Sequence, residues 1–208
     1  MNARSGYLLL VEDDPDILKL LNTTLTFRGY RVITASNGKE GLDVVRQERP
    51  ALVIADIMMP KLDGFGLVHR LRINPETRNI PVIFITATFL SPEDKEFALE
   101  IGVTRFIQKP LDMDAFLHTV AGLLEQGMGA AIEPLREYSF YEGYRTRLEV
   151  KLAQKNKQIT RDETLLAANP HEDASILASL RQAIRERDEL KILLDQLGGY
   201  LAKLDKPE

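Results

Sequence analysis

Four short, largely apolar runs in the first 110 residues each lead into a polar or charged residue. Runs this short predict strands that are buried on both faces, as in a parallel sheet. Open α/β sheets place their ligands at the carboxyl ends of their strands, so we expect the polar residues to meet at one edge. The runs lie at 7–11, 52–55, 82–85 and 106–108, and the residues that follow them are Glu12, Asp13 and Asp14, then Asp56, Thr86 and Lys109.

The segments between these runs show helical periodicity, with apolar residues three and four positions apart. A further strand is expected at 31–35, which gives five strands at 7–11, 31–35, 52–56, 82–86 and 104–108. Helices are expected at 15–28, 38–47, 65–71, 92–101 and 113–126. Strands that alternate with helices predict an α/β fold, a doubly wound parallel sheet with helices on both faces.

The pattern changes after residue 126, where Gly127, Gly129 and Pro134 mark a linker over 127–134. Long helices are expected at 135–168 and from Asn169-Pro170 to about 204, with apolar residues at heptad spacing. The sequence predicts a long α-helical hairpin or coiled coil over 135–208 and leaves open whether the helices fold back or form one rod. The expected seam contains Tyr141, Leu148, Leu152, Lys155, Ile159, Asp162 and Leu166, then Ile176, Leu180, Ala183, Arg187, Leu190, Leu194, Leu197, Leu201 and Leu204.

Composition narrows the class of protein. The hydrophobic share of 44% and the charged share of 28% are those of an ordinary globular chain. No run of about 18 apolar residues predicts a membrane span, the first six residues lack the apolar core of an export signal, and cysteine is absent. We therefore expect a cytoplasmic protein with no membrane partner. The net charge is -4, and residues 134–208 carry 13 basic and 13 acidic residues, which disfavours nucleic-acid binding.

Five sequence pieces resemble the receiver domain of two-component response regulators, the CheY-like family. They are Val-Glu-Asp-Asp-Pro at 11–15, Asp-Ile-Met-Met-Pro-Lys-Leu-Asp-Gly at 56–64, Thr-Ala at 86–87, Phe-Ile-Gln at 106–108 and Lys-Pro at 109–110. The pieces occur in the same order as in members of that family, and the numbers of residues between them are about the same. The resemblance implies a receiver domain over 1–126 with a flavodoxin-like strand order of 2-1-3-4-5.

The resemblance also assigns a role to each residue of the expected site. Asp56 is the phosphoacceptor, and Mg²⁺ is the cofactor, bound by Asp13 directly, by Glu12 through water, by Asp56 and by the backbone carbonyl of Met58. Glu12 departs from the commonest pattern of the family, which has aspartate there. Carboxylate and carbonyl oxygens suit Mg²⁺, which prefers octahedral oxygen ligands and retains several waters.

The remaining roles concern the phosphoryl group and the response to it. By resemblance, Lys109 pairs with a phosphoryl oxygen, Thr86 donates its hydroxyl to another, and Thr86 and Phe106 form the switch pair. The Lys109–Pro110 bond is expected to be cis. Asp14 is expected to cap the helix that begins at Pro15.

These assignments predict a phosphoacceptor signalling protein and not an enzyme. A sensor histidine kinase is the expected phosphodonor, and the C-terminal helices are expected to form a homodimer or bind a partner. Two alternatives stay open: a constitutively dimeric adaptor or fragment of a larger signalling protein, and a histidine phosphotransfer element at His171. His171-Glu172 matches the dipeptide of phosphorylated kinase histidines, but it lies at the expected break between helices.

Overall fold

The computed structural model describes residues 6–86, 92–126, 134–168 and 174–204. The chain divides into two compact units, Met1–Leu135 and Arg136–Glu208. The structure matches both predicted ends of the elements at 38–47, 52–56, 82–86 and 113–126, and the other elements differ from prediction by one to four residues at one or both ends. The expected linker at 127–134 lies almost wholly outside the described residues.

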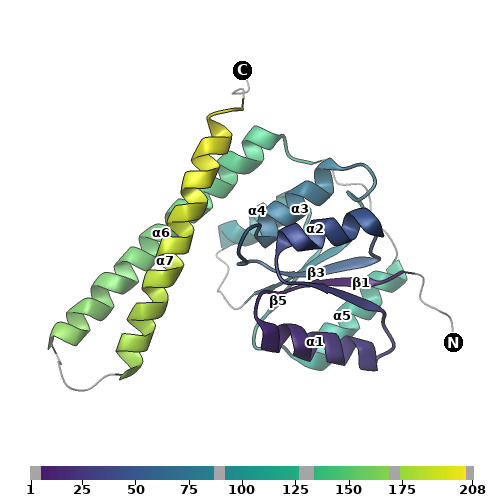
Figure 1. Ribbon diagram of the computed structural model, residues 1–208, viewed down its shortest axis with the longest axis horizontal. Helices are drawn as coiled ribbons and strands as arrows, with labels where there is room; N and C mark the ends of the chain where they lie inside the picture. The colour runs from purple at the N-terminus through teal and green to yellow at the C-terminus, as the bar shows by residue number, and fades with distance from the viewer. Residues whose placement is uncertain (1–5, 87–91, 127–133, 169–173, 205–208) are drawn as a thin grey trace. The chain divides into compact units, whose positions relative to one another are not determined.

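The first unit is built on a five-stranded parallel sheet, shown in Figure 1. Its strands lie in the order β2-β1-β3-β4-β5, so the flavodoxin-like order that the resemblance implied is confirmed. All positions of β1, β3 and β4 are buried, which explains why their sequences are apolar without alternation. The strands are β1 (Leu8–Val11), β2 (Val32–Ala35), β3 (Leu52–Asp56), β4 (Val82–Thr86) and β5 (Arg105–Gln108).

Five helices cover the two faces of this sheet. Helices α1 and α5 lie on one face, and α2, α3 and α4 lie on the other (Figure 1). Side-chain caps fix where three of them begin, because Asp14, Asn37 and Asp63 each accept hydrogen bonds from backbone N–H groups of the first turn. The helices are α1 (Pro15–Phe27), α2 (Gly38–Gln47), α3 (Gly64–Ile73), α4 (Pro92–Glu100) and α5 (Met113–Gln126).

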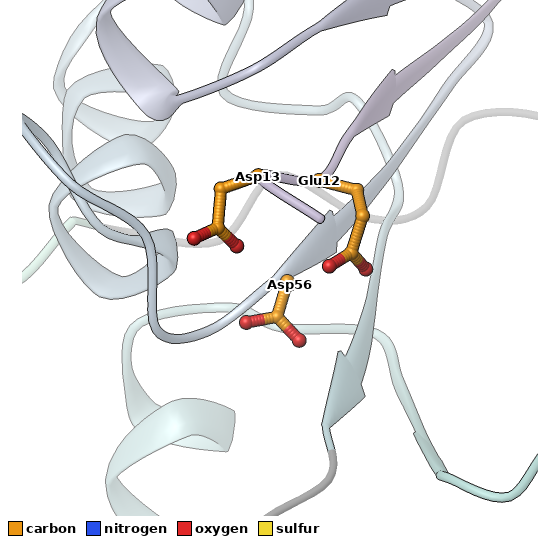
Figure 2. Close-up of side chains that lie close together, drawn as sticks. All are labelled: Glu12, Asp13 and Asp56. Carbon is orange, nitrogen blue, oxygen red and sulfur yellow. The ribbon is translucent and has the colours of Figure 1, made fainter. Parts of the chain in front are cut away.

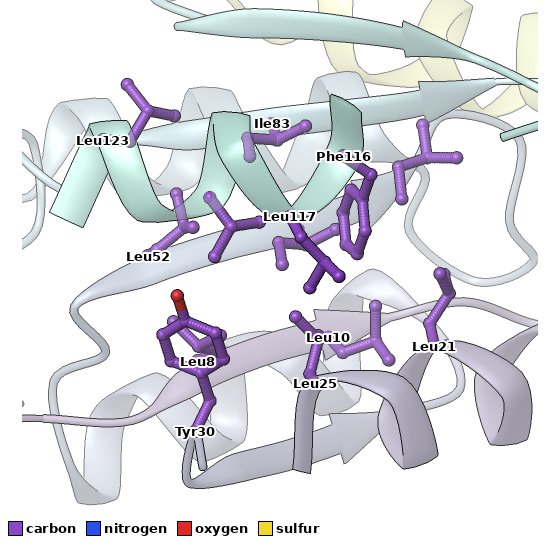
Figure 3. Packing of buried hydrophobic residues seen from close by; sticks show 13 residues of the cluster. Leu8, Leu10, Leu21, Leu25, Tyr30, Leu52, Ile83, Phe116, Leu117 and Leu123 are labelled. Atoms are coloured by element: carbon purple, nitrogen blue, oxygen red, sulfur yellow. The ribbon is translucent and has the colours of Figure 1, made fainter. Parts of the chain in front are cut away.

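The main core lies between the sheet and helices α1 and α5, as Figure 3 shows. Leu21 and Leu25 of α1 and Phe116 and Val120 of α5 are fully buried against side chains from the central strands. The strand residues in this core are Leu8, Leu10, Leu52, Ile54, Ile83 and Ile85. Burial of this apolar surface provides most of the stability of the domain and holds the strand ends in place.

Aromatic residues fill the opposite face of the sheet around Phe84 of β4. The ring of Phe65 on α3 meets it edge-on at 5.5 Å, and the ring of Phe106 on β5 lies 6.0 Å away. Phe97 of α4 in turn lies 5.6 Å from Phe65. The two edge-to-face pairs with Phe84 are favourable arrangements that join α3 and β5 to β4. The tilted pair of Phe97 with Phe65 joins α4 to α3.

The second unit is an antiparallel hairpin of two long helices, α6 (Glu137–Ala168) and α7 (Ala174–Leu201). Its contacts run in opposite chain directions: the ring of Tyr141 stacks on Tyr200 at 5.7 Å, whereas Asp162 accepts a hydrogen bond from Ser179. This order excludes a continuous rod within the chain. The predicted break residues Asn169-Pro170, and His171, lie outside the described residues.

The expected heptad seam is the contact between the two helices. Tyr141, Leu148 and Ile159 of α6 are buried, as are Ala183, Leu190 and Leu197 of α7. Polar side chains occupy part of the seam, since Asp162 is 8% exposed and Lys155 forms an ion pair with Glu186 at 2.5 Å. In the described part of the chain, no helix has the length and apolar character needed to cross a membrane.

Candidate functional site

The carboxyl ends of β1 and β3 bring three acidic side chains together (Figure 2). Val11 is paired in register with Ala55, so the residues that follow these two positions become neighbours at the edge of the sheet. One carboxylate oxygen from each of Glu12, Asp13 and Asp56 lies within 4.8 Å of the others. The residues that the sequence predicted as metal ligands therefore form one cluster.

Lys109 connects two of these carboxylates. Its Nζ lies 2.9 Å from Oε2 of Glu12 and 3.1 Å from Oδ1 of Asp56, and all three side chains are largely buried. The lysine follows β5, where its backbone N–H donates to the carbonyl of Thr86 at 2.8 Å. The Lys109–Pro110 bond is cis, as predicted. An ammonium held between two carboxylates is placed to neutralise an anion at this point.

Burial controls the acidity of the cluster. It raises the pKa of the Glu12, Asp13 and Asp56 carboxyls above their ordinary values, because a carboxylate loses favourable hydration there. The hydrogen bonds and charge of Lys109 oppose this shift at Glu12 and Asp56. Burial alone would lower the pKa of the Lys109 ammonium, but Glu12 and Asp56 together outweigh it and raise that pKa.

The loop after β3 orients the Asp56 carboxylate. The backbone N–H of Met58 donates to Oδ2 of Asp56 at 2.8 Å, and the other oxygen, Oδ1, faces Lys109. The loop folds back tightly, since the N–H of Gly64 donates to the carbonyl of Ile57 at 2.8 Å. Both oxygens of Asp56 thus have defined partners, which hold the carboxylate in one orientation.

Thr86 and Phe106 lie on the adjoining strands. Thr86 is the last residue of β4, the strand next to β3, and it is buried. Phe106 on β5 is half-buried with its ring against Phe84. Every predicted site residue except His171 is described, and each lies at or near the carboxyl edge of the sheet.

The contact between Glu12 and Lys109 was not predicted from the sequence. The resemblance assigned Glu12 to the metal and Lys109 to the phosphoryl group, and it named no pairing between them. The extra methylene of glutamate, compared with the commoner aspartate, was the available signal, because it lets the carboxylate reach farther toward β5. The hydrogen bond from Met58 N–H to Asp56 was also absent from the prediction.

The donor set suits a hard divalent cation. Three carboxylates that meet within 4.8 Å repel one another, and burial that raises their pKa values strengthens the attraction for a positive ion. Oxygen ligands of this kind are those that Mg²⁺ prefers. With the ammonium of Lys109 beside it, the cluster can hold a cation and a dianionic group at the same point.

The sequence and the fold are similar to those of known proteins. A family model described as the response regulator receiver domain matches residues 8–121, more than half of the chain. The transcriptional regulatory protein GlrR of Escherichia coli (strain K12) is 41% identical over 138 residues, which are 66% of this chain and 30% of that protein. The chain thus spans less than a third of the length of that relative.

Two further comparisons extend the match. A protein of Cyanidium caldarium named "Probable transcriptional regulator ycf27" is 30% identical over 205 residues, 97% of this chain and 79% of that protein. The crystal structure of the signal receiver domain of a signal transduction histidine kinase from Syntrophus aciditrophicus has 35% identity and a TM-score of 0.55, covering 59% of this chain and 92% of that chain. The chain therefore belongs to the response regulators of two-component systems, and residues 8–121 are its receiver domain.

Proposed function

We propose that the chain is a switch that accepts a phosphoryl group on Asp56 from a sensor histidine kinase. The observation that carries this proposal is the Asp56 carboxylate, oriented by Met58 N–H through Oδ2 and paired with Lys109 through Oδ1. A carboxylate oxygen attacks the phosphorus of a phosphohistidine, so a new O–P bond forms while the N–P bond breaks. The imidazole leaves with the electron pair of that bond and takes up a proton.

The neighbouring residues stabilise the charge that this transfer brings into the site. Lys109 pairs with one phosphoryl oxygen, and the hydroxyl of Thr86 donates to another. Glu12, Asp13, Asp56 and the carbonyl of Met58 would hold Mg²⁺, which supplies positive charge to the phosphoryl oxygens. The chain itself contributes positioning and electrostatics, in keeping with a signalling protein whose chemistry is confined to its own phosphorylation.

Intact-mass spectrometry after incubation with acetyl phosphate tests this proposal. The wild-type chain is expected to gain one phosphoryl group in the presence of Mg²⁺, and Asp56→Asn is expected to gain none. Asp14→Asn is the matched control, because Asp14 is also acidic and close in sequence but caps α1, a role that asparagine fills equally well. Loss of the modification in both variants, or in neither, would contradict the assignment to Asp56.

The hairpin is proposed as the output module, acting as a homodimer or on a protein partner. Two helices alone cover little of each other, and they leave Val150 53%, Ile192 58% and Tyr200 50% exposed. Two hairpins that pair into a four-helix bundle would cover such residues. Light scattering after size exclusion tests this directly: a dimer supports the proposal, and a monomer both with and without beryllofluoride would contradict self-association.

Protein partners are proposed in preference to nucleic acid, although the two relatives named above are called transcriptional regulators. The hairpin and its flanks carry equal numbers of basic and acidic residues, 13 of each over 134–208. DNA binding draws most of its affinity from basic side chains on phosphates. We expect no binding to duplex DNA in fluorescence anisotropy at physiological salt. Saturable binding would contradict the proposed protein partner and would indicate that the hairpin recognises DNA.

Phosphorylation is proposed to reach the hairpin through the sequence that joins α5 to α6. Asp56, Thr86 and Phe106 bias the receiver between two states, and the chain continues from α5 into the hairpin. Hydrogen exchange measured with and without beryllofluoride checks this relay. Changed protection of α6 or α7 supports it, and identical protection throughout the hairpin contradicts it.

A further inference from the structure

We infer that the N-terminus of α2 clamps the loop that follows the phosphoacceptor, so that Gly38 and Glu40 are positioning residues for the metal and phosphoryl site. The loop, residues 57–63, is called the acceptor loop, and Asn37, Gly38 and Glu40 are called the clamp. The inference deepens the function proposed above and rests on it. Neither Gly38 nor Glu40 belongs to the acidic cluster, and no functional role was predicted for either from the sequence.

A backbone hydrogen bond forms the first contact of the clamp. The N–H of Gly38 donates to the carbonyl of Leu62 at 2.9 Å, so the start of α2 touches the far end of the acceptor loop. A Cβ at position 38 would lie 2.5 Å from the Leu62 carbonyl oxygen and 3.1 Å from its Cγ. Since the closest of these atoms is backbone, no side-chain rotation could relieve the clash. Glycine is therefore required for this approach, and any other residue displaces the loop.

An ion pair forms the second contact. Nζ of Lys61 lies 3.3 Å from Oε1 of Glu40, and Lys61 has a left-handed backbone with φ of 66°. Glu40 is itself held in place, because Asn37 Nδ2 donates to it at 2.7 Å and the hydroxyl of Ser36 donates at 2.7 Å. The hydrogen bonds from Ser36, followed by those from Asn37 and Lys61, lower the pKa of Glu40 to about 2. The clamp thus presents a fixed negative charge to the acceptor loop.

The two ends of the acceptor loop are held together beside the end of β3. The N–H of Gly64 donates to the carbonyl of Ile57 at 2.8 Å, and a Cβ at Gly64 would lie 2.5 Å from the carbonyl oxygen of Asp56. The loop is short and held at both ends, so a shift at Leu62 is transmitted to the residues between. Met58 lies among them, with its N–H on Asp56 Oδ2.

Met58 links the clamp to the chemistry. Its N–H orients the phosphoacceptor, and its carbonyl is the proposed metal ligand on the same peptide segment. Groups that orient metal ligands commonly alter metal affinity by 10-fold to 100-fold when they are removed. The clamp accordingly sets the affinity for Mg²⁺ and the orientation of Asp56, and does not merely stabilise α2.

The test compares Gly38→Ala with Gly122→Ala in the full chain. Gly122 lies within α5, and a Cβ there would meet nothing within 4 Å. Gly122→Ala therefore restricts the backbone as Gly38→Ala does, but it introduces no steric clash. The chain has no tryptophan, so amide NMR is the suitable probe. Titration with Mg²⁺ is expected to show affinity about tenfold weaker in Gly38→Ala. Unchanged affinity in a folded Gly38→Ala chain would overturn the inference.

A second variant, Lys61→Met, guards against a misfolded Gly38→Ala chain. Lys61 is mostly exposed, so its replacement leaves the core intact. Loss of a positive charge near the site by itself favours Mg²⁺, whereas loss of the clamp weakens its binding. Affinity about twofold to threefold weaker is therefore expected if the clamp acts. Affinity that is unchanged or tighter would overturn the inference.

Hydrogen exchange of the Met58 amide, measured without Mg²⁺, separates this inference from the proposed function. The clamp predicts faster exchange in Gly38→Ala and Lys61→Met than in the wild type and in Gly122→Ala. If the wild-type chain binds no Mg²⁺, the proposed metal site is contradicted. The exchange rates of the Met58 amide still test whether the clamp holds the acceptor loop. Equal exchange rates in all four proteins would reject it.

Discussion

The receiver domain and the helical hairpin bury their apolar residues in different ways. Each central strand of the receiver is buried at every position, between strands on both edges and helices on both faces. The hairpin has a single seam, and that seam includes Asp162 and Lys155. The dense core of the receiver fixes where its strand ends lie, and with them the site. The hairpin, by contrast, leaves large apolar side chains such as Val150 and Ile192 exposed.

The two units are expected to respond separately to core truncation. Leu52→Ala in β3 and Leu190→Ala in α7 each remove a buried side chain, and each should lower the free energy of unfolding of its own unit by about 2–5 kcal/mol. Urea unfolding followed by NMR signals from each unit measures both. Equal losses in the two units from either substitution would contradict their independence.

The ammonium of Lys109 is expected to matter more to phosphorylation than to metal binding. Lys109→Met should slow phosphorylation by acetyl phosphate about 100-fold, since a preorganised charge at the phosphoryl oxygens is lost. It should also tighten Mg²⁺ binding, because Glu12 and Asp56 lose their counter-ion. Lys157→Met, an exposed lysine of the hairpin, is the control. Slower phosphorylation with weaker Mg²⁺ binding would contradict this assignment of roles.

Acid is expected to destabilise the receiver through His69. Burial lowers the pKa of this histidine from 6.5 to about 4, so the folded receiver binds fewer protons than the unfolded chain between these values. Above pH 6.5 the neutral His69 side chain makes its full contribution to the free energy of unfolding. As pH falls toward 4, up to about 3 kcal/mol of that free energy is lost.

The pH dependence of receiver unfolding measures this effect. His69→Gln should flatten the profile between pH 6.5 and 4, whereas His118→Gln, an exposed histidine on α5, should leave it unchanged. A profile of the same slope in wild type and His69→Gln would show that other groups cause the acid sensitivity.

The polar part of the hairpin seam is expected to have the smallest effect. Ser179→Ala removes the hydroxyl that donates to the buried Asp162 at 2.8 Å and should lower hairpin stability by about 1 kcal/mol. Thr160→Ala is the control, because that hydroxyl bonds only within its own helix, to Asn156. Thermal unfolding followed by circular dichroism compares the two, and equal stabilities would mean that the polar contact is not part of the seam's stability.

The sequence predicted the receiver far more completely than it predicted the hairpin's role. Apolar runs that end in Glu12, Asp56, Thr86 and Lys109 specify a sheet and also its reactive edge, because parallel strands align their carboxyl ends. Heptad spacing predicted the seam of α6 and α7 equally well. It gave no information on partners, because an exposed apolar side chain such as Ile192 has no motif to identify its contact.

Contacts between side chains of different strands were the main omission at the site. The pairing of Glu12 with Lys109 joins residues 97 positions apart, and only the fold shows that the longer side chain reaches. The close approach of the Gly38 backbone to the Leu62 carbonyl likewise becomes visible only in the folded structure. Such features depend on how loops pack, which local pattern does not encode.

Reductive trapping of the phosphorylated chain tests the central claim most directly. Borohydride converts an aspartyl phosphate into homoserine, and peptide mass spectrometry then locates the modified residue. After incubation with acetyl phosphate and Mg²⁺, we expect homoserine at position 56 and no modification at Asp13, Asp14 or Asp63. Homoserine at one of those positions, or a phosphoryl group found on His171, would contradict the assignment of Asp56 as the phosphoacceptor.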